Sequence, residues 1–187
     1  MTIEESIRQI CENTLKPLEY VSKNGAKTIN EYIIKCESLK DFNYNDIRED
    51  QNFEILFKNI QKIEGPTVYY FEVVSGNQSD EIVKALKLYS LSENAKTTPP
   101  LNPTYSKGKI LYVGKVKKKM WGRLIQHLGF YKVNKTQGLQ LYYWAMTIPL
   151  TLKLVVIEFE PEMDTLVGVI EKKIAHNLNP MLGKHRD

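Results

Sequence analysis

The chain has 187 residues, of which 42% are hydrophobic and 26% charged, and its formal net charge is +4. This length allows one domain with a sizeable core plus an appendage. No apolar run approaches the ~20 residues that a membrane span needs, so we expect no membrane partner. The acidic, amphipathic N-terminus is unlike a signal peptide. With Cys11 and Cys36 as its only cysteines, the chain suggests neither a disulfide scaffold nor a zinc site, and a cytoplasmic location fits best.

The positive charge lies in the C-terminal two-thirds of the chain. Residues 1–64 hold 9 Lys/Arg and 12 Asp/Glu, a net charge of −3, whereas residues 65–187 hold 17 Lys/Arg and 10 Asp/Glu, a net charge of +7. A basic surface favours a polyanion because binding releases counterions. On charge alone, a solvated lysine face is the simpler interpretation.

Apolar periodicity predicts three helices before Gly65, and therefore a helical N-terminal extension over residues 1–64. The first covers residues 2–15, with a capping box formed by Thr2 and Glu5. We expect its core-facing side chains to be Ile3, Ile7, Ile10 and Leu15. A second helix over 28–39 would bury Ile29, Tyr32, Ile33 and Cys36. The third would run from Asn45 or Asp46 to Ile60 or Ile63.

Gly65-Pro66 marks a boundary, after which a strand is predicted over 68–74 and a helix over 80–90. Residues 91–108 form a predicted loop with three prolines. A second strand begins at Ile110 and is expected to stop at Gly114. Four lysines follow within five residues, and then a helix over 120–128 that ends at Gly129.

The rest of the chain is predicted to alternate between strands and a helix. A basic, polar link over 131–138 leads to an aromatic-rich strand over 139–146, whose rings are more often core than a stacking surface for bases. Another strand covers 151–159. Pro161 opens the last helix, which buries Leu166, Ile170 and Ile174 and ends at Asn179 before a proline.

Six residues in order carry a resemblance to a known family: Tyr69, Tyr112, Gly114, Arg123, His127 and Glu171. Arg123 lies eleven positions after Tyr112, and His127 follows one helical turn later on the same face. This set resembles the GIY-YIG nuclease superfamily over residues 65–184. The resemblance implies an α+β fold with a small, mostly antiparallel sheet flanked by helices. It makes residues 65–187 a nuclease-like domain with an insertion at about 76–108.

The resemblance also implies roles for these residues. Glu171 would bind the metal, Mg²⁺ or Mn²⁺, and Arg123 would clamp the scissile phosphate beside His127. Tyr69 would act as general base or orient water, and Tyr112 would line the same site. The substrate, most plausibly DNA, would contact Gly114, Lys115, Lys117, Lys118 and Lys119. Plain strand packing remains the alternative for both tyrosines, and a solvent-facing charge the alternative for Glu171.

Two positions depart from the family pattern. Thr67 stands where the family has its first glycine, and Met181 stands after Pro180 where the family often has an asparagine. The implied function is a metal-dependent endonuclease acting on DNA. An RNA nuclease and a non-catalytic nucleic-acid-binding module of the same fold remain alternatives, and a homodimer is left open.

Overall fold

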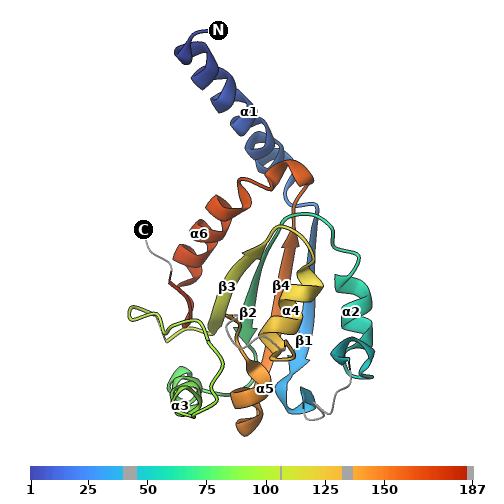
Figure 1. The fold of residues 1–187 in the computed structure, drawn as a ribbon, viewed down its shortest axis with the longest axis vertical. Coiled ribbons are helices and arrows are strands. Elements are labelled where there is room, and N and C mark those ends of the chain that lie inside the picture. The colour runs from blue at the N-terminus through green and yellow to red at the C-terminus, as the bar shows by residue number, and fades with distance from the viewer. Residues whose placement is uncertain (40–45, 106, 132–136, 185–187) are drawn as a thin grey trace.

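A four-stranded sheet with strand order β1-β4-β2-β3 forms the centre of the molecule, and every neighbouring pair is antiparallel (Figure 1). The computed structural model describes residues 1–39, 46–105, 107–131 and 137–184. Helices flank the sheet, and one of them is N-terminal, so the predicted α+β class is confirmed. Within the described ranges, no helix is long and apolar enough to cross a membrane.

The strands are β1 (Thr28–Lys35), β2 (Thr67–Val73), β3 (Ile110–Val116) and β4 (Thr151–Glu158). The helices are α1 (Ile3–Asn24), α2 (Glu54–Ile60), α3 (Ser79–Ser90), α4 (Met120–Leu128), α5 (Leu141–Trp144) and α6 (Val167–Leu178). Short 3-10 turns are η1 (Cys36–Leu39), η2 (Ile47–Glu49), η3 (Ala145–Thr147) and η4 (Pro161–Met163). The predicted link over 131–138 falls largely on residues 132–136, which lie outside the described residues.

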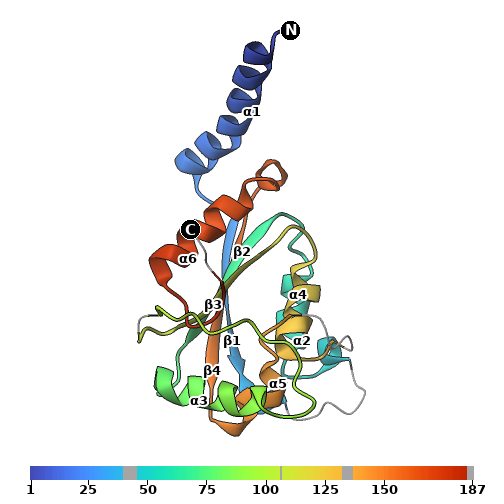
Figure 2. The same ribbon diagram turned by 60° about the vertical axis from the view of Figure 1, so that its left-hand side comes forward.

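The sheet separates two hydrophobic clusters. Alternate side chains of a strand point to opposite faces, so Tyr69 and Phe71 join the larger cluster while Val68 joins the smaller one. Helices α2, α3, α4 and α5 contribute to the larger cluster, and α6 contributes to the smaller. Figure 2 shows α6 on one side of the sheet with α2 and α4 on the other.

The helix predicted over 28–39 is wrong, because residues 28–35 form β1 at one edge of the sheet. Ile29 and Ile33 are exposed, whereas Ile34 is buried. The β-branched and aromatic content of this segment favours a strand. Pairing with β4 then overrides the helical spacing of its apolar residues. The sheet therefore contains strands from both sides of Gly65, and the division of the chain at that glycine stays a prediction.

Helix α1 starts with the predicted capping box, since Thr2 and Glu5 exchange hydrogen bonds of 2.6 and 3.2 Å. It runs to Asn24, longer than predicted, and extends away from the body (Figure 1). No residue of α1 is buried, so the expected core role of Ile3, Ile7, Ile10 and Leu15 is wrong. Of its apolar side chains, Leu18 and Val21 near the C-terminal end pack against the smaller cluster.

Two further predictions are wrong. The expected strand over 139–146 is the short helix α5 followed by η3. The Trp144 indole N–H donates to the Leu139 carbonyl at 2.7 Å, which fixes a tight turn there. The expected helix from about 46 to 60 is broken into η2 and α2. By contrast, α3, α4, β2 and β4 lie within one residue of their predicted ranges.

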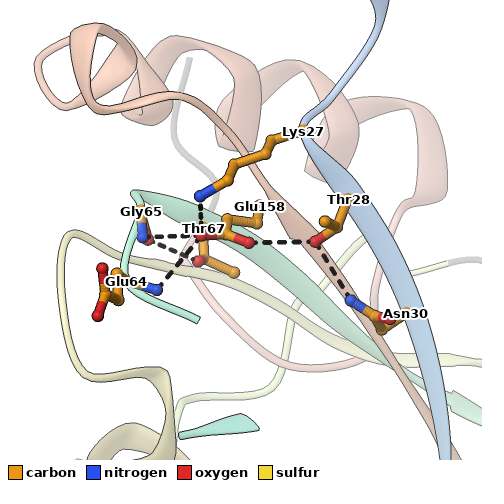
Figure 3. A network of polar contacts seen from close by, with 7 residues as sticks. All are labelled: Lys27, Thr28, Asn30, Glu64, Gly65, Thr67 and Glu158. Atoms are coloured by element: carbon orange, nitrogen blue, oxygen red, sulfur yellow. Dashed lines mark hydrogen bonds and ion pairs between the residues drawn. The ribbon is translucent and has the colours of Figure 1, made fainter. Parts of the chain in front are cut away.

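A buried carboxylate joins the segment before Gly65 to the rest of the sheet (Figure 3). Glu158, only 3% exposed, ends β4. It accepts hydrogen bonds from Lys27 at 3.1 Å and Thr28 at 3.2 Å. The amides of Glu64 and Gly65 donate to the same side chain at 3.3 and 3.0 Å. Buried charge is tolerated only when it is well paired, and these contacts fix where β1, β2 and β4 meet.

The outer edge of β3 is covered by the segment that follows α6. The Met181 amide donates to Ile110 at 2.9 Å, and the Leu182 amide donates to Leu111 at 3.0 Å. Leu101 of the loop between α3 and β3 forms an antiparallel bridge to Leu182 on the other side. Two segments far apart in sequence therefore lie side by side along this edge.

Candidate functional site

Tyr69 and Tyr112 lie on the neighbouring strands β2 and β3. In the β2–β3 register, Tyr69 pairs with Gly114 and Phe71 pairs with Tyr112. The strand does not stop at Gly114, which is a correction to the predicted boundary. A Cβ on Gly114 would lie 2.6 Å from the Tyr69 hydroxyl oxygen and 2.7 Å from the Tyr112 ring. The missing side chain therefore makes room for both rings.

The hydroxyl of Tyr69 forms hydrogen bonds with two side chains of α4. His127 Nε2 lies 2.8 Å from the hydroxyl oxygen, and the Arg123 Nε–H donates to it at 3.0 Å. The four-residue spacing of Arg123 and His127 puts both on one helix face. Helix α4 ends at Gly129, whose φ of 97° is left-handed, as the sequence predicted.

His127 is fully buried and neutral. Its Nδ1 accepts a hydrogen bond from the Leu139 amide at 3.1 Å, so the neutral ring carries its proton on Nε2 and donates it to Tyr69. Burial lowers the pKa of His127 well below its ordinary value, and the positive charge of Arg123 lowers it further. The ring packs between Tyr69, Phe71 and Tyr112, with centroid distances of 5.5, 5.3 and 5.2 Å.

The guanidinium of Arg123 is held from two directions. Beyond its bond to Tyr69, its Nη1 donates to the Gln126 side chain at 2.7 Å and to the Gln137 carbonyl at 2.9 Å. Burial lowers the pKa of Arg123, but contacts with Tyr69 and Tyr112 outweigh this and leave its pKa raised. The sequence reading missed both glutamines. The three-residue spacing of Gln126 from Arg123 indicates that the two side chains can meet on one helix face. No local pattern in the sequence indicates the contact between Arg123 and Gln137.

Tyr69 does not suit the general-base role that the resemblance implied. Its side chain is 0% exposed. Burial raises the pKa of Tyr69, and electrostatic interactions with Tyr112 and Glu171 raise it further, so the opposing effect of Arg123 does not restore an ordinary value. A buried phenol that already accepts two hydrogen bonds is suited to holding Arg123 and His127 in place.

Glu171 lines a polar pocket of about 320 Å³ at the covered edge of β3. The lining comes from β3 (Tyr112, Val113), the loop before it (Pro99, Pro100), the segment after α6 (Gly183, Lys184), and the side chains of Gln137 and Glu171. Lys115 Nζ lies 3.2 Å from the Glu171 carboxylate. The carboxylate is largely shielded, with its side chain 14% exposed.

Helices α4 and α6 cover opposite faces of the sheet, so Arg123 and Glu171 can approach each other only around the edge that borders the pocket. Tyr112 points toward the larger cluster and also lines the Glu171 pocket. Gln137 lines that pocket too, and its carbonyl holds Arg123. Arg123 itself is not among the lining residues. The pocket and the Arg123 network are thus adjacent and share Tyr112 and Gln137.

The lysines expected to contact substrate differ in their surroundings. Lys115 pairs with Glu171, and Lys117 pairs with Asp164 at 3.0 Å. Lys118 and Lys119 are exposed, and Lys119 has a left-handed φ of 59° just before α4. All four follow the part of β3 that borders the pocket. Only Lys115 is bonded to a residue that lines it.

Glu171 supplies a carboxylate to this pocket. Among the residues that the structure describes, no group of three or more His, Cys, Asp or Glu side chains gathers around one point. Mg²⁺ is commonly held by one or two carboxylates plus waters, so the partly shielded Glu171 in a polar pocket fits such an ion. Lys115 would have to give up part of its contact with that carboxylate.

Comparisons with protein-family models, with curated proteins and with solved structures each found no match.

Proposed function

We propose that this protein is a metal-dependent endonuclease that hydrolyses phosphodiester bonds in DNA. The observation that carries the proposal is the adjacency of the Glu171 pocket and the Arg123–Tyr69–His127 network. Glu171 comes from α6, Arg123 and His127 come from α4, and Tyr69 comes from β2, so three separate elements bring these groups to the region of one sheet edge. Metal-assisted phosphodiester hydrolysis uses a carboxylate that holds the metal, a fixed cation for the phosphate, and a group that orients water.

The fixed cation is Arg123. Its Nε–H and one Nη are bonded to Tyr69, Gln126 and Gln137, so the plane of the guanidinium is set before substrate arrives. Preorganised donors of this kind stabilise charge that develops in the transition state without reorganisation during the reaction. Tyr69 and His127 act through Arg123 and are positioning residues.

Tyr112 takes the place nearest the reacting water in this proposal. It lines the pocket with Glu171, whereas Tyr69 is buried. A divalent cation held by Glu171 would add positive charge at the phosphate and make the attacking water more acidic. The water oxygen forms a bond to phosphorus as one P–O ester bond breaks. The proton lost by the water reaches the leaving oxygen through solvent, which gives one phosphate monoester and one hydroxyl.

The test is cleavage of plasmid, circular single-stranded DNA and RNA by purified protein, with and without Mg²⁺ or Mn²⁺. Glu171→Gln and Arg123→Ala should each lower the rate by about 10²–10³, the size of effect seen when one transition-state stabiliser is removed. Glu162→Gln, an exposed carboxylate in η4, is the matched control and should keep full activity. Wild-type activity in Glu171→Gln would refute the metal assignment. Retention of nucleic-acid binding without any cleavage would favour the binding-module alternative.

A further inference from the structure

The loop before β3 crosses the edge of the sheet beside the pocket. At one end, the amide of Gly138 donates to Thr97 at 3.3 Å and the Gln137 side chain donates to Thr98 at 3.4 Å. Further along, the Pro100 carbonyl accepts from the Gly183 amide at 2.9 Å. Residues 97–104, here called the strap, are therefore bonded to chain segments on both sides of the pocket.

An asparagine pair fastens the strap to the segment after α6. Asn102 donates from its side chain to the Asn179 side-chain oxygen and to the Pro180 carbonyl, both at 3.0 Å. Asn179 donates in return to the Thr104 carbonyl at 2.9 Å. The backbone N–H of Asn102 also donates to the backbone carbonyl of Met181 at 2.8 Å. Asn179 has a left-handed φ of 44° as the cap of α6, which asparagine tolerates better than most residues.

The strap is stiff as well as fastened. Pro99 and Pro100 have φ fixed by their rings, and both line the same pocket as Glu171. Pro99 is buried although it lies in a loop. A loop with restricted dihedrals and hydrogen bonds at both ends is already ordered, so ligand binding does not have to spend free energy on ordering it. The strap is thus a preformed part of the pocket lining.

We propose that this wall restricts the site to a single nucleic-acid strand, with one nucleotide entering the pocket unpaired. The proposal rests on the proposed function and names the substrate class for the same site. A pocket of about 320 Å³ is at the small end of the range for ligand sites, ~300–1,000 Å³. That volume is of the order of one nucleotide and is too small to enclose a base pair.

The chemistry of the lining fits an unpaired nucleotide. Tyr112 offers a ring on which a base can stack, a contact that tolerates any base. Lys184, which lines the pocket, and Lys115, which is paired with Glu171, provide cations for the phosphates that flank the nucleotide. A paired base can reach such a pocket only after it is unstacked and unpaired, which costs free energy that a single strand does not spend.

The experiment compares one labelled oligonucleotide as a single strand and in a blunt duplex. Binding is measured by fluorescence anisotropy in EDTA, and cleavage is measured separately with Mg²⁺. We expect the single strand to bind at least about tenfold more tightly, a difference of 1.4 kcal/mol, and to be the strand that is cut. Asn102→Ala should open the strap and reduce this preference, while Asn94→Ala, an exposed asparagine earlier in the loop, should leave it unchanged.

Pro100→Gly is a second route to a loose strap that leaves the asparagine pair intact, so the test survives a folding failure of Asn102→Ala. Equal or tighter binding of the duplex by wild-type protein would overturn the inference and leave the nuclease proposal standing. An unchanged preference in both loosened variants would also overturn it. Preferential single-strand binding without cleavage would support the inference and refute the nuclease proposal, and no binding to either oligonucleotide would refute both.

Discussion

The Nε2 atom of His127 lies 2.8 Å from the hydroxyl oxygen of Tyr69, and both side chains are fully buried. Nδ1 of His127 accepts a hydrogen bond from the Leu139 amide, so the ring must stay neutral, and it donates to the tyrosine from Nε2. The same oxygen accepts from Arg123. The titratable His127 and the cationic Arg123 therefore share one hydrogen-bond partner, the hydroxyl of Tyr69.

His127 should make the fold less stable in mild acid. Its pKa is lowered in the folded protein by burial and by Arg123, while in the unfolded chain it is near ~6.5. The stability that the neutral, buried His127 contributes is thus fully present above the pKa of the unfolded chain. It is lost as the pH falls below that value, because the unfolded chain then binds a proton that the folded protein does not bind. The loss should approach about 1.4 kcal/mol per pH unit, the limit for one proton.

Urea unfolding at several pH values measures this dependence. His127→Gln should be less stable overall and should lack the part of the slope that appears as the pH falls below ~6.5. His176→Gln, an exposed histidine on α6, should keep it. A wild-type slope in His127→Gln would mean that other groups cause the dependence.

Tyr69→Phe should lower both stability and activity. Removing the hydroxyl leaves the donors of Arg123 and His127 without their buried acceptor, which costs about 1–3 kcal/mol. The free energy of unfolding and the cleavage rate are the measurements. Tyr70→Phe is the matched control, since that neighbouring ring is only partly buried and points to the other face of β2. Equal effects in the two variants would argue against the positioning role.

Gly114→Ala should destabilise the protein because its methyl group would overlap two rings. The nearest atom, the Tyr69 hydroxyl oxygen, would be 2.6 Å away. Overpacking of this kind costs about 1–3 kcal/mol. Gly122→Ala in α4 has nothing within 4 Å of the new methyl group, so it should stabilise the helix by about 0.5–1 kcal/mol. Thermal unfolding of the two variants should therefore shift in opposite directions, and a shared direction would contradict the packing described here.

Glu158→Gln should weaken the junction of β1, β2 and β4 by about 1–3 kcal/mol. Burial alone would raise the pKa of Glu158, but the Gly65 amide and Lys27 lower it, and its net pKa is below the ordinary value. The amide of glutamine brings a donor to a place already filled with donors. Hydrogen exchange should report faster opening of β1 in this variant. Unchanged exchange in β1 would show that the strand is held by its ladder to β4 alone.

Neutralising Lys118 and Lys119 should reduce the salt dependence of nucleic-acid binding. Both side chains are exposed and follow the strand that borders the pocket. Each lost phosphate contact should lower the slope of log K against log salt by about 0.7 on a single strand. Lys84 and Lys87 on α3 serve as the control pair. An unchanged slope would place Lys118 and Lys119 away from the bound strand.

Local signals in the sequence were sufficient for parts of this fold. The regular spacing of Met120, Leu124 and Leu128 and the glycine after them specify α4 almost to the residue. The segment that became β1 fits both a helical and an alternating pattern, and its pairing with β4, more than a hundred positions away, decided between them. The aromatic residues of α5 have a local preference for a strand, but the segment forms a short helix, and the hydrogen bond from the Trp144 indole to the Leu139 carbonyl holds the turn before it.

The candidate site was predictable where residues lie one helical turn apart or on paired strands. Arg123 and His127 share a helix face, and both meet Tyr69. The burial of Tyr69 could not be read from a strand whose two faces are both apolar. The Asn102–Asn179 pair was missed as well, because two asparagines 77 positions apart leave no periodic pattern.

The strand order has a consequence for the time at which the protein can fold during synthesis. Strand β4 lies between β1 and β2, so β1 has no partner until residues 151–158 have been made. Thr28 pairs with Glu158, and a ribosome adding roughly 5–20 residues per second takes on the order of ten seconds to cover that interval. Throughout it, Ile29, Ile33 and Ile34 belong to an unpaired segment. β2 and β3 can pair earlier, so the half of the sheet that carries both tyrosines forms first and the N-terminal strand is added last.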